Sequence, residues 1–321
     1  MLEMKVTVSV IIITYKHESY IKETLEGILM QECDCNVEVI IADDKSPDKT
    51  ETIVLDLINN HVNGHWIKYT KHSHNKGMMP NFIWALKKCS GKYIALCEGD
   101  DYWIDPLKLQ KQVDFLEANR DYGVVHTDAN VYFQNTNRLI ENVNKLNKVN
   151  QVQLDNPAEE LILGNYRIYT LTALFRSDLI DKVNFEAFKK FKMGDLPLWL
   201  TLTQFTKFYY INEPTAVYRK AEGSASNPSS KRARLDFKIS SKEVRLYFAN
   251  SLNLNASTIN KVSDQYHKAV LRKKFEDKES GMSSKTFFSI HKKSLKDLVL
   301  FLGCKSKIVN TIVKTVAPNM S

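Results

Sequence analysis

Long apolar runs and glycine-rich loops are both missing from this sequence of 321 residues. No stretch approaches the roughly 18 consecutive apolar residues of a membrane-spanning helix, so none is expected. Residues 1–15 have neither a cationic leader nor a small-residue cleavage site, and we expect a strand there instead of a signal peptide. Glycine occurs only 11 times, and neither GxGxxG nor GxxxxGK[ST] is present. This absence argues against a dinucleotide-binding fold and against a P-loop nucleotide hydrolase.

Cysteine is also scarce, with five residues scattered along the chain. Cys33 and Cys35 form one CxC pair without a second pair at zinc-finger spacing, so a structural zinc site is not expected. An odd number of scattered cysteines is typical of reduced thiols, and we expect a cytoplasmic protein.

The net charge of +8 is concentrated in the C-terminal third. Residues 229–321 contain 19 Lys and Arg against 7 Asp and Glu, whereas residues 1–228 contain 26 against 30. Segment 295–316 also has apolar residues at helical spacing with lysines between them, among them Leu298, Leu302, Ile308 and Ile312. This pattern favours peripheral attachment to the inner face of an anionic membrane. A helical appendage packed on the main domain and a dimer contact remain open alternatives.

Hydrophobic periodicity predicts an α/β fold in the first half of the chain. We expect strands at 6–14, 37–43, 65–71, 92–98 and 122–133, and helices at 19–31, 46–60, 81–90 and 105–119. Strands and helices that alternate in this way imply a parallel sheet covered by helices on both faces. Residues 134–158 are expected to form a loop or an irregular excursion, and 159–219 a shorter α+β stretch. Residues 224–232 are expected to form a linker, and the chain from 233 onward basic helices.

Polar side chains follow the first four expected strands, where ligands bind in an open parallel sheet. They are Thr14, Tyr15 and Lys16; Asp43, Asp44, Lys45 and Ser46; His72, His74, Asn75 and Lys76, which precede Gly77; and Glu98, Asp100 and Asp101. The acidic group at 98–101 suits Mg²⁺ or Mn²⁺, which prefer carboxylate oxygens and complete their coordination with substrate phosphates. A helix cap before Asp105, with the other acids solvated, is the alternative.

Five motifs together resemble family-2 glycosyltransferases, which are inverting enzymes. The motifs are VSVIIITYKHESYIKETLEGIL, VEVIIADDKSPDKT, NKGMMPNF, YIALCEGDDYWIDPLKLQKQVDFLE and MGDLPLWL. The resemblance covers about residues 5–225. It implies a single Rossmann-like A-type domain with a mostly parallel central sheet flanked by helices. The expected catalytic domain is 1–228, with a nucleotide-sugar half at 1–128 and an acceptor half at 129–228. A basic helical extension follows at 229–321.

The same resemblance implies roles for individual residues. Nucleotide binding falls to Thr14, Tyr15, Asp44, Asn75, Lys76 and Asp100, with Tyr15 stacked on uracil and Asp44 accepting the N–H of the base. Asp101 would bind the metal ion, and Asp195 would act as general base. Contacts to the sugar or diphosphate are expected from Glu98, Trp103 and Arg219. The chain departs from the family at Ala221, where many relatives have a histidine. Either Arg219 or Lys220 would supply the positive charge, or the loop would close differently.

The implied function is metal-dependent transfer of a sugar from a nucleotide-diphosphate sugar, with UDP-sugar favoured, to an acceptor hydroxyl. The expected acceptor is a saccharide or lipid-linked saccharide in capsule, O-antigen or other polysaccharide synthesis. Nucleic acid is not an expected partner. Two alternatives are kept. One is a nucleotidyltransferase, although TYKHESY is no glycine-rich basic loop, and the other is a non-catalytic binding protein that uses the basic tail.

Overall fold

The computed structural model describes residues 7–146, 156–224, 227–277 and 283–316. The chain divides into two compact units. The first unit comprises Met1–Pro157, Asn165–Lys189 and Leu198–Glu222. The second comprises Ala158–Gly164, Lys190–Pro197 and Gly223–Ser321, so it includes two short segments that precede the C-terminal helices.

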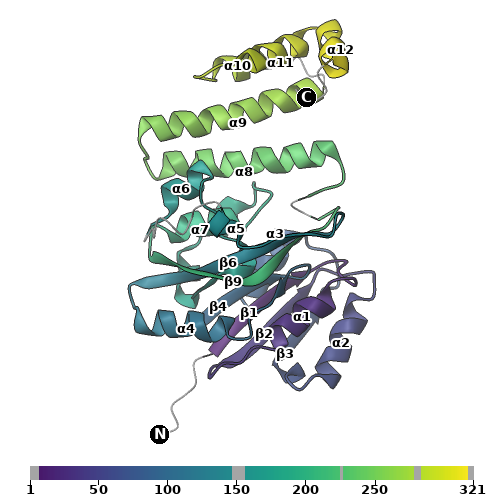
Figure 1. The fold of residues 1–321 in the computed structure, drawn as a ribbon, viewed down its shortest axis with the longest axis vertical. Coiled ribbons are helices and arrows are strands. Elements are labelled where there is room, and N and C mark those ends of the chain that lie inside the picture. The colour runs from purple at the N-terminus through teal and green to yellow at the C-terminus, as the bar shows by residue number, and fades with distance from the viewer. Residues whose placement is uncertain (1–6, 147–155, 225–226, 278–282, 317–321) are drawn as a thin grey trace. The chain divides into compact units, whose positions relative to one another are not determined.

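Four parallel strands form one half of the sheet in the first unit (Figure 1). They are β1 (Thr7–Thr14), β2 (Asn36–Asp43), β3 (Ile67–Lys71) and β4 (Tyr93–Glu98), in the order β3-β2-β1-β4. Val and Ile dominate β1 and β2, and nearly every position of both strands is buried. This is the composition expected of strands covered on both faces, and the predicted parallel sheet is confirmed.

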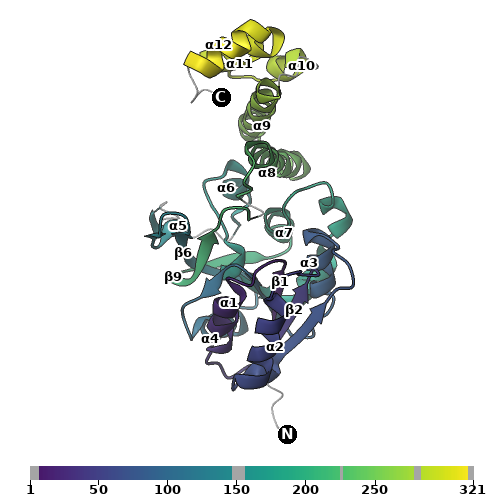
Figure 2. The ribbon, with the colours of Figure 1, turned by 90° about the vertical axis from the view of Figure 1, so that its right-hand side faces the viewer.

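Helices cover both faces of this half-sheet. The helices α1 (Ile21–Leu29), α2 (Thr50–Asn60) and α4 (Lys108–Ala118) share one buried cluster with the sheet face that carries Val8, Val10 and Ile12. The helix α3 (Met78–Leu86) contributes no residue to that cluster and lies on the other face, as Figure 2 shows. The connection through α3 therefore places β4 beside β1, on the edge of β1 opposite β2.

The other half of the sheet mixes strand directions. It continues from β4 through β8 (Leu174–Arg176), β6 (Tyr122–Phe133) and β9 (Lys207–Lys220) to β5 (Tyr102–Trp103), with β7 (Arg138–Ile140) beside β6. β8 is antiparallel to both neighbours, whereas β6 and β9 run parallel. The sequence pattern predicted only β6 as a separate strand, since β5, β7 and β8 span two or three residues and show no periodicity.

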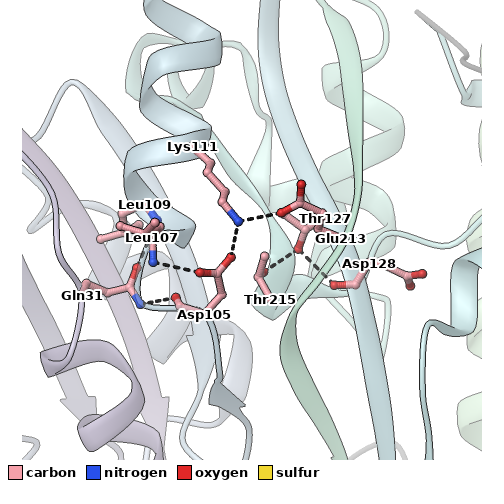
Figure 3. Close-up of polar contacts among 9 residues, drawn as sticks. All are labelled: Gln31, Asp105, Leu107, Leu109, Lys111, Thr127, Asp128, Glu213 and Thr215. Atoms are coloured by element: carbon pink, nitrogen blue, oxygen red, sulfur yellow. Dashed lines mark hydrogen bonds and ion pairs between the residues drawn. The ribbon is translucent and has the colours of Figure 1, made fainter.

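An irregularity in β9 links this half to α4. Thr127 pairs with Ile211 but Asp128 pairs with Pro214, so two residues of β9 bulge out where proline cannot donate a ladder hydrogen bond. Glu213 lies in the bulge and binds Lys111 Nζ at 2.6 Å, and Lys111 also binds Asp105 at 2.8 Å (Figure 3). The bulge thus fixes the start of α4 against β9.

Gln31 fixes the same helix against α1. Its amide donates to the Asp105 carbonyl at 2.7 Å and accepts the Leu109 N–H at 3.0 Å (Figure 3). Contacts of Gln31 and Lys111 to Asp105 therefore hold the segment between the acidic turn at 98–101 and the start of α4 at Lys108.

One local prediction was wrong. The helix after β2 begins at Thr50 instead of Ser46, because Ser46 is used in the loop that precedes it. The expected loop at 134–158 contains β7 and the short helix α5 (Val143–Leu146). Part of that loop, residues 147–155, lies outside the described residues. Two further helices are α6 (Ala158–Leu163) and α7 (Asp195–Leu202).

The C-terminal helices of the second unit have a core of their own. They are α8 (Lys231–Ser251), α9 (Ala256–Glu276), α10 (Ser283–Phe288), α11 (Leu295–Lys305) and α12 (Lys307–Val316). Leu271 and Phe275 of α9 pack with Phe287, Leu300 and Cys304. The predicted basic helices are confirmed. None of the helices in the described ranges is long and apolar enough to cross a bilayer.

A buried carboxylate ties the central strands together near the start of β1. Glu38 on β2 is 5% exposed and accepts hydrogen bonds from Ser9, from Ser90 and from Lys68. Burial alone would raise the pKa of Glu38, but these hydrogen bonds outweigh it and lower that pKa to about 2. The charged form is therefore stabilised by folding.

We predict that Glu38→Gln lowers the free energy of unfolding at pH 7 by about 2 kcal/mol, because Ser9, Ser90 and Lys68 lose a charged acceptor. An unfolded Glu takes up its proton near pH 4.3, and the folded Glu38 does so only near 2. The contribution is therefore present above about pH 4.3 and is lost as the pH falls toward 2. Urea unfolding of both proteins from pH 7 to pH 3 measures it. The exposed Glu141→Gln is the control, and equal stabilities of Glu38→Gln and wild type at pH 7 would contradict the prediction.

Candidate active site

The ends of β1, β2 and β4 meet at one edge of the sheet. Thr14 pairs with Asp43, and Ile13 pairs with Glu98. Backbone hydrogen bonds continue beyond the strands, from Asp44 N–H to the Thr14 carbonyl at 2.9 Å and from Gly99 N–H to the Ile13 carbonyl at 3.2 Å. The polar groups that follow these strands are thus brought together, as the sequence predicted.

The loops after β1 and β2 are joined to each other by hydrogen bonds. Lys16 N–H donates to Ser46 Oγ at 3.0 Å, and His17 N–H donates to Thr50 Oγ1 at 3.1 Å. Glu18 N–H donates to the Asp48 carboxylate at 3.1 Å. Backbone N–H groups of the loop after β1 are thus satisfied by side chains that follow β2, so the two segments hold each other in place.

Tyr15 lies in the loop after β1 with its ring partly in solvent. It is 40% exposed, and Lys16 Nζ lies 5.1 Å from its ring centroid. Lys16 and Lys45 both adopt positive φ, at 61° and 64°, a conformation that is rare for residues with a side chain. Such strain is found where a surrounding structure imposes a loop shape, frequently at functional sites.

The two aspartates after β2 have different partners. Asp43 is fully buried and accepts from Ser46 N–H at 2.7 Å and from the Tyr69 hydroxyl at 2.6 Å. Asp44 accepts from the backbone N–H groups of Lys76 at 2.6 Å and Gly77 at 2.9 Å. Asp43 therefore shapes the turn, and Asp44 holds the loop after β3. Each carboxylate oxygen has two lone pairs, so Asp44 retains capacity for a further donor.

The loop after β3 is fixed by these contacts. Asn75 donates its side-chain amide to the Asp44 carbonyl at 3.1 Å and accepts the Gly77 N–H at 3.1 Å. Lys76 is half-buried, with its Nζ 5.8 Å from the centroid of the Trp84 ring. Asn75 and Lys76 thus border the same edge as Asp44.

The acidic turn after β4 is built around Asp101. This side chain is 1% exposed, and its Oδ1 accepts the backbone N–H of Arg219 on β9 at 2.7 Å. Its Oδ2 is buried and has no hydrogen-bond partner among the described residues. Burial, followed by the nearby charges of Asp100 and Glu98, raises the pKa of Asp101 well above its ordinary value. A bare buried carboxylate oxygen is costly unless a cation binds it.

The donor set fits a hard divalent cation. Within the described residues, no three His, Cys, Asp or Glu side chains converge to hold a metal by themselves. Mg²⁺ and Mn²⁺ sites that hold a diphosphate use one or two carboxylates, and waters and phosphate oxygens supply the rest. Asp101 Oδ2, with the half-buried Asp100 and Glu98 beside it, provides such a partial site.

Gly99 lets β1 and the acidic turn approach closely. A Cβ atom at Gly99 would lie 2.6 Å from His17 Nδ1 and 2.9 Å from Thr14 Oγ1. His17 in turn lies 3.2 Å from Thr14 Oγ1. Burial lowers the pKa of His17, while Asp100 opposes that shift, so the ring beside the acidic turn is neutral at pH 7. Sequence reasoning missed His17, although it lies in the loop after the first strand.

Arg219 is enclosed, although sequence reasoning assigned it to a diphosphate. It is 6% exposed, and its Nε donates to the Asp100 carbonyl at 2.8 Å. Its two terminal nitrogens bind Gln134 at 3.1 Å and Glu23. The guanidinium also lies about 5 to 6 Å from the ring centroids of Tyr20, Tyr102 and Tyr132. These contacts indicate that Arg219 holds the acidic turn in position from within the protein.

Trp103 belongs to the core and not to an open pocket. Its indole is 2% exposed and donates to the Leu171 carbonyl at 2.9 Å. The buried Lys108 lies over its ring with Nζ 4.1 Å from the centroid, and burial lowers the pKa of Lys108 to about 7. An indole covered in this way has no face for a sugar, so the structure gives the expected sugar contact of Trp103 no support.

Asp195 belongs to α7, and Ala221 to the chain that follows β9. Asp195 is the first residue of α7, belongs to the second unit and is half-buried, which suits a carboxylate at a helix N-terminus. Pro197 follows within the first turn, where proline is tolerated. Ala221, the residue in place of the family histidine, is 4% exposed and follows directly on β9.

We predict that Arg219→Lys lowers the free energy of unfolding by about 2 kcal/mol, since an ammonium group cannot reproduce the three differently directed hydrogen bonds. Urea unfolding measures this loss. Arg138→Lys on the exposed β7 is the matched control and should stay within about 0.5 kcal/mol of wild type. An equally small change for Arg219→Lys would show that the bracing contacts contribute little.

Comparison with curated proteins finds partial relatives. A segment of 126 residues is 39% identical to the uncharacterized protein Rv1520 of Mycobacterium tuberculosis and covers 39% of this chain and 36% of that protein. The chain thus matches about a third of the length of this relative. A segment of 134 residues is 34% identical to the UDP-Glc:alpha-D-GlcNAc-diphosphoundecaprenol beta-1,3-glucosyltransferase WfaP of Escherichia coli, covering 42% of this chain and 47% of WfaP.

Solved structures share the fold. TarS 1–349 of S. aureus in complex with UDP-GlcNAc aligns with a TM-score of 0.57 at 19% identity, over 93% of this chain and 79% of that one. The mannosyltransferase PcManGT of Pyrobaculum calidifontis in complex with GDP-Man and Mn²⁺ aligns with a TM-score of 0.55 at 14% identity, over 97% and 87%. At these identities the likeness concerns the fold alone, and it confirms the predicted A-type architecture.

The family model described as Glycosyl transferase family 2 matches residues 9–177. This range contains β1 from its third residue onward, β2 to β4, the acidic turn and the Asp44 loop, which are the elements that build the edge described above. Since the match covers more than half of the 321 residues, the chain belongs to glycosyl transferase family 2.

Proposed function

We propose that this chain is an inverting, metal-dependent glycosyltransferase that uses a nucleotide-diphosphate sugar, with a UDP-sugar as donor. The observation that supports it most is the buried Oδ2 of Asp101, which has no hydrogen-bond partner among the described residues and lies at the strand-end edge of a family-2 domain. A buried carboxylate oxygen without a partner lowers the stability of the fold, and a bound metal–diphosphate would offset that cost.

The groups at the edge suit a nucleoside. Tyr15 has a partly exposed ring for stacking on the base, and Asp44 retains acceptor capacity for the N–H of a uracil. Thr14, Asn75, Lys76 and Asp100 complete the proposed nucleotide contacts. The names of the relatives support UDP through WfaP and TarS, whereas PcManGT was solved with GDP-Man, so the fold alone admits either base.

Mn²⁺ or Mg²⁺ is the proposed cofactor, with Asp101 as ligand and Asp100 and Glu98 nearby. When bound, the cation would neutralise negative charge on the diphosphate leaving group. PcManGT was solved with Mn²⁺, which supports the choice of ion. Arg219 would keep Asp100 and Asp101 in position, since its side chain and backbone bind both residues.

Asp195 is the proposed general base. It would take the proton of the acceptor hydroxyl as that oxygen attacks the anomeric carbon from the face opposite the diphosphate, which inverts the sugar. Asp195 is the first residue of α7, so its half-buried carboxylate lies at the N-terminus of that helix.

The proposed acceptor is a saccharide, free or linked to a lipid, in polysaccharide synthesis. WfaP, whose name includes a diphosphoundecaprenol acceptor, supports the lipid-linked form. A cytoplasmic enzyme on the inner membrane face would reach such an acceptor. The nucleotidyltransferase alternative gains nothing from the structure, since the loop after β1 is held by Ser46 and Thr50 without a glycine-rich phosphate cradle.

We predict that Asp101→Asn abolishes metal binding without loss of stability. The amide oxygen can still accept the Arg219 N–H, and the uncompensated buried charge is removed. Thermal unfolding with and without Mn²⁺ should show that the ion raises Tm of the wild type but not of Asp101→Asn. Asp114→Asn on the exposed side of α4 is the control and should respond as the wild type does. A Tm increase in Asp101→Asn equal to that of the wild type would show that the metal binds elsewhere.

We predict that Asp195→Asn lowers kcat by about a hundredfold to ten-thousandfold, the range expected for loss of a general base. Asn is nearly equivalent to Asp at a helix N-terminus, so stability and donor affinity should be unchanged. Transfer assays with a UDP-sugar and calorimetry with UDP separate the two effects. Asp178→Asn, an exposed carboxylate, is the control. A kcat within threefold of the wild-type value would remove Asp195 from the mechanism.

A further inference from the structure

The helix α11 is apolar on two opposite sides. Leu300 and Cys304 face the core formed with α9 and α10 and are nearly buried. Leu295, Leu298 and Leu302, spaced three and four residues apart, lie on the other side and are 74%, 40% and 45% exposed. A surface helix that only packs on its neighbours would carry polar residues on this second side.

The helix α12 repeats this arrangement. Asn310 is buried and donates its side-chain amide to the Phe275 carbonyl at 2.8 Å, which fastens α12 to α9. Ile308, Ile312 and Val316, spaced four residues apart, are 73%, 54% and 77% exposed. Together with Leu295, Leu298 and Leu302 they are called the C-terminal helix face below. Figure 1 shows α10, α11 and α12 on the side of α9 opposite α8, so within this unit α8 does not cover them.

Positive charge accompanies the C-terminal helix face. Residues 283–316 contain seven lysines, at positions 285, 292, 293, 296, 305, 307 and 314. Asp297 is the only carboxylate in this range, and it is 4% exposed because it forms a capping box with Ser294 at the start of α11. The surface of α10–α12 therefore combines exposed aliphatic side chains with a strong positive charge that has no exposed acid of its own.

This combination selects among partners. A second copy docked through the same face would bring two sets of seven lysines together without an exposed acid in 283–316 to neutralise them. A nucleic acid would satisfy the lysines but leave six exposed aliphatic side chains without an apolar partner. A bilayer with anionic lipid supplies both an apolar interior and negative headgroups, and long lysine side chains reach the headgroups from partly inserted helices.

We propose that the C-terminal helix face docks on the surface of a bilayer that contains anionic lipid, with its six aliphatic side chains inserted below the headgroups and the exposed lysines of 283–316 bound to them. This deepens the proposed function, because it would place the enzyme where a lipid-linked acceptor lies. It stands on a separate part of the chain, so each can fail without the other.

The test is co-flotation of the full chain with vesicles of phosphatidylcholine alone and with 30% phosphatidylglycerol. The expected result is binding to the anionic vesicles at low salt, weaker binding as salt rises, and little binding to neutral vesicles. Absence of binding to anionic vesicles at low salt would overturn the proposal.

Two sets of variants separate the apolar and charged contributions. Ile308→Gln with Ile312→Gln should weaken vesicle binding about tenfold or more at every salt concentration. Lys292→Gln, Lys305→Gln and Lys307→Gln together should weaken it about a hundredfold at low salt and flatten its salt dependence. The matched controls should bind as the wild type does. They are Val62→Gln with Phe205→Gln, which are 83% and 51% exposed, and Lys49→Gln, Lys87→Gln and Lys182→Gln, all exposed.

Two further measurements keep the outcomes distinct. Circular dichroism verifies that the variants remain helical, as expected for exposed positions. UDP affinity with Mn²⁺ should be the same in the wild type and in all face variants, so that loss of vesicle binding is separated from loss of the donor site. Vesicle binding that both variant sets leave unchanged would overturn the proposal. So would a lipid-independent dimer that Ile308→Gln with Ile312→Gln dissociates, since that outcome assigns the face to a second copy.

Discussion

The hydrogen bond from the Arg219 backbone to Asp101 Oδ1 connects the two halves of the catalytic sheet. Asp101 ends the turn after the last strand of the parallel half, and Arg219 lies on β9 in the mixed half. This one bond orients the carboxylate so that Oδ2 is buried and bare. The Arg219 side chain adds a second bond to the same turn, through the Asp100 carbonyl. A costly carboxylate is thus held in place by strand geometry, and this cost is what a bound cation would offset.

The parallel half of the sheet could be predicted because its signals are local. β-Branched runs mark β1 and β2, and the groups that follow them must meet at one edge once the strands are parallel. The role of Asp43 in the turn also follows from a local contact, with Ser46 three residues later. Sequence periodicity contains this information without knowledge of the tertiary fold.

The roles of Trp103 and Arg219 could not be predicted in the same way. Trp103 is buried because β5 pairs with β9, and Arg219 is enclosed by side chains from α1, β5 and β6. These contacts join segments that are distant in sequence and have no periodic pattern. A tryptophan or arginine beside an acidic motif has the same local sequence whether it faces a ligand or the core. The helix after β2 was expected to begin at Ser46 for a similar reason, since Lys16, the partner of Ser46, lies in another loop.

The central claim is that the strand-end edge binds a nucleoside diphosphate through a metal at Asp101. Calorimetric titration of UDP into the full chain, with and without Mn²⁺ and repeated with GDP, tests it most directly. The account predicts tight binding of UDP only when Mn²⁺ is present, and weaker binding of GDP because Tyr15 and Asp44 are matched to uracil. UDP binding of equal strength without metal would contradict the role of Asp101, and no binding of either nucleotide would contradict the site as a whole.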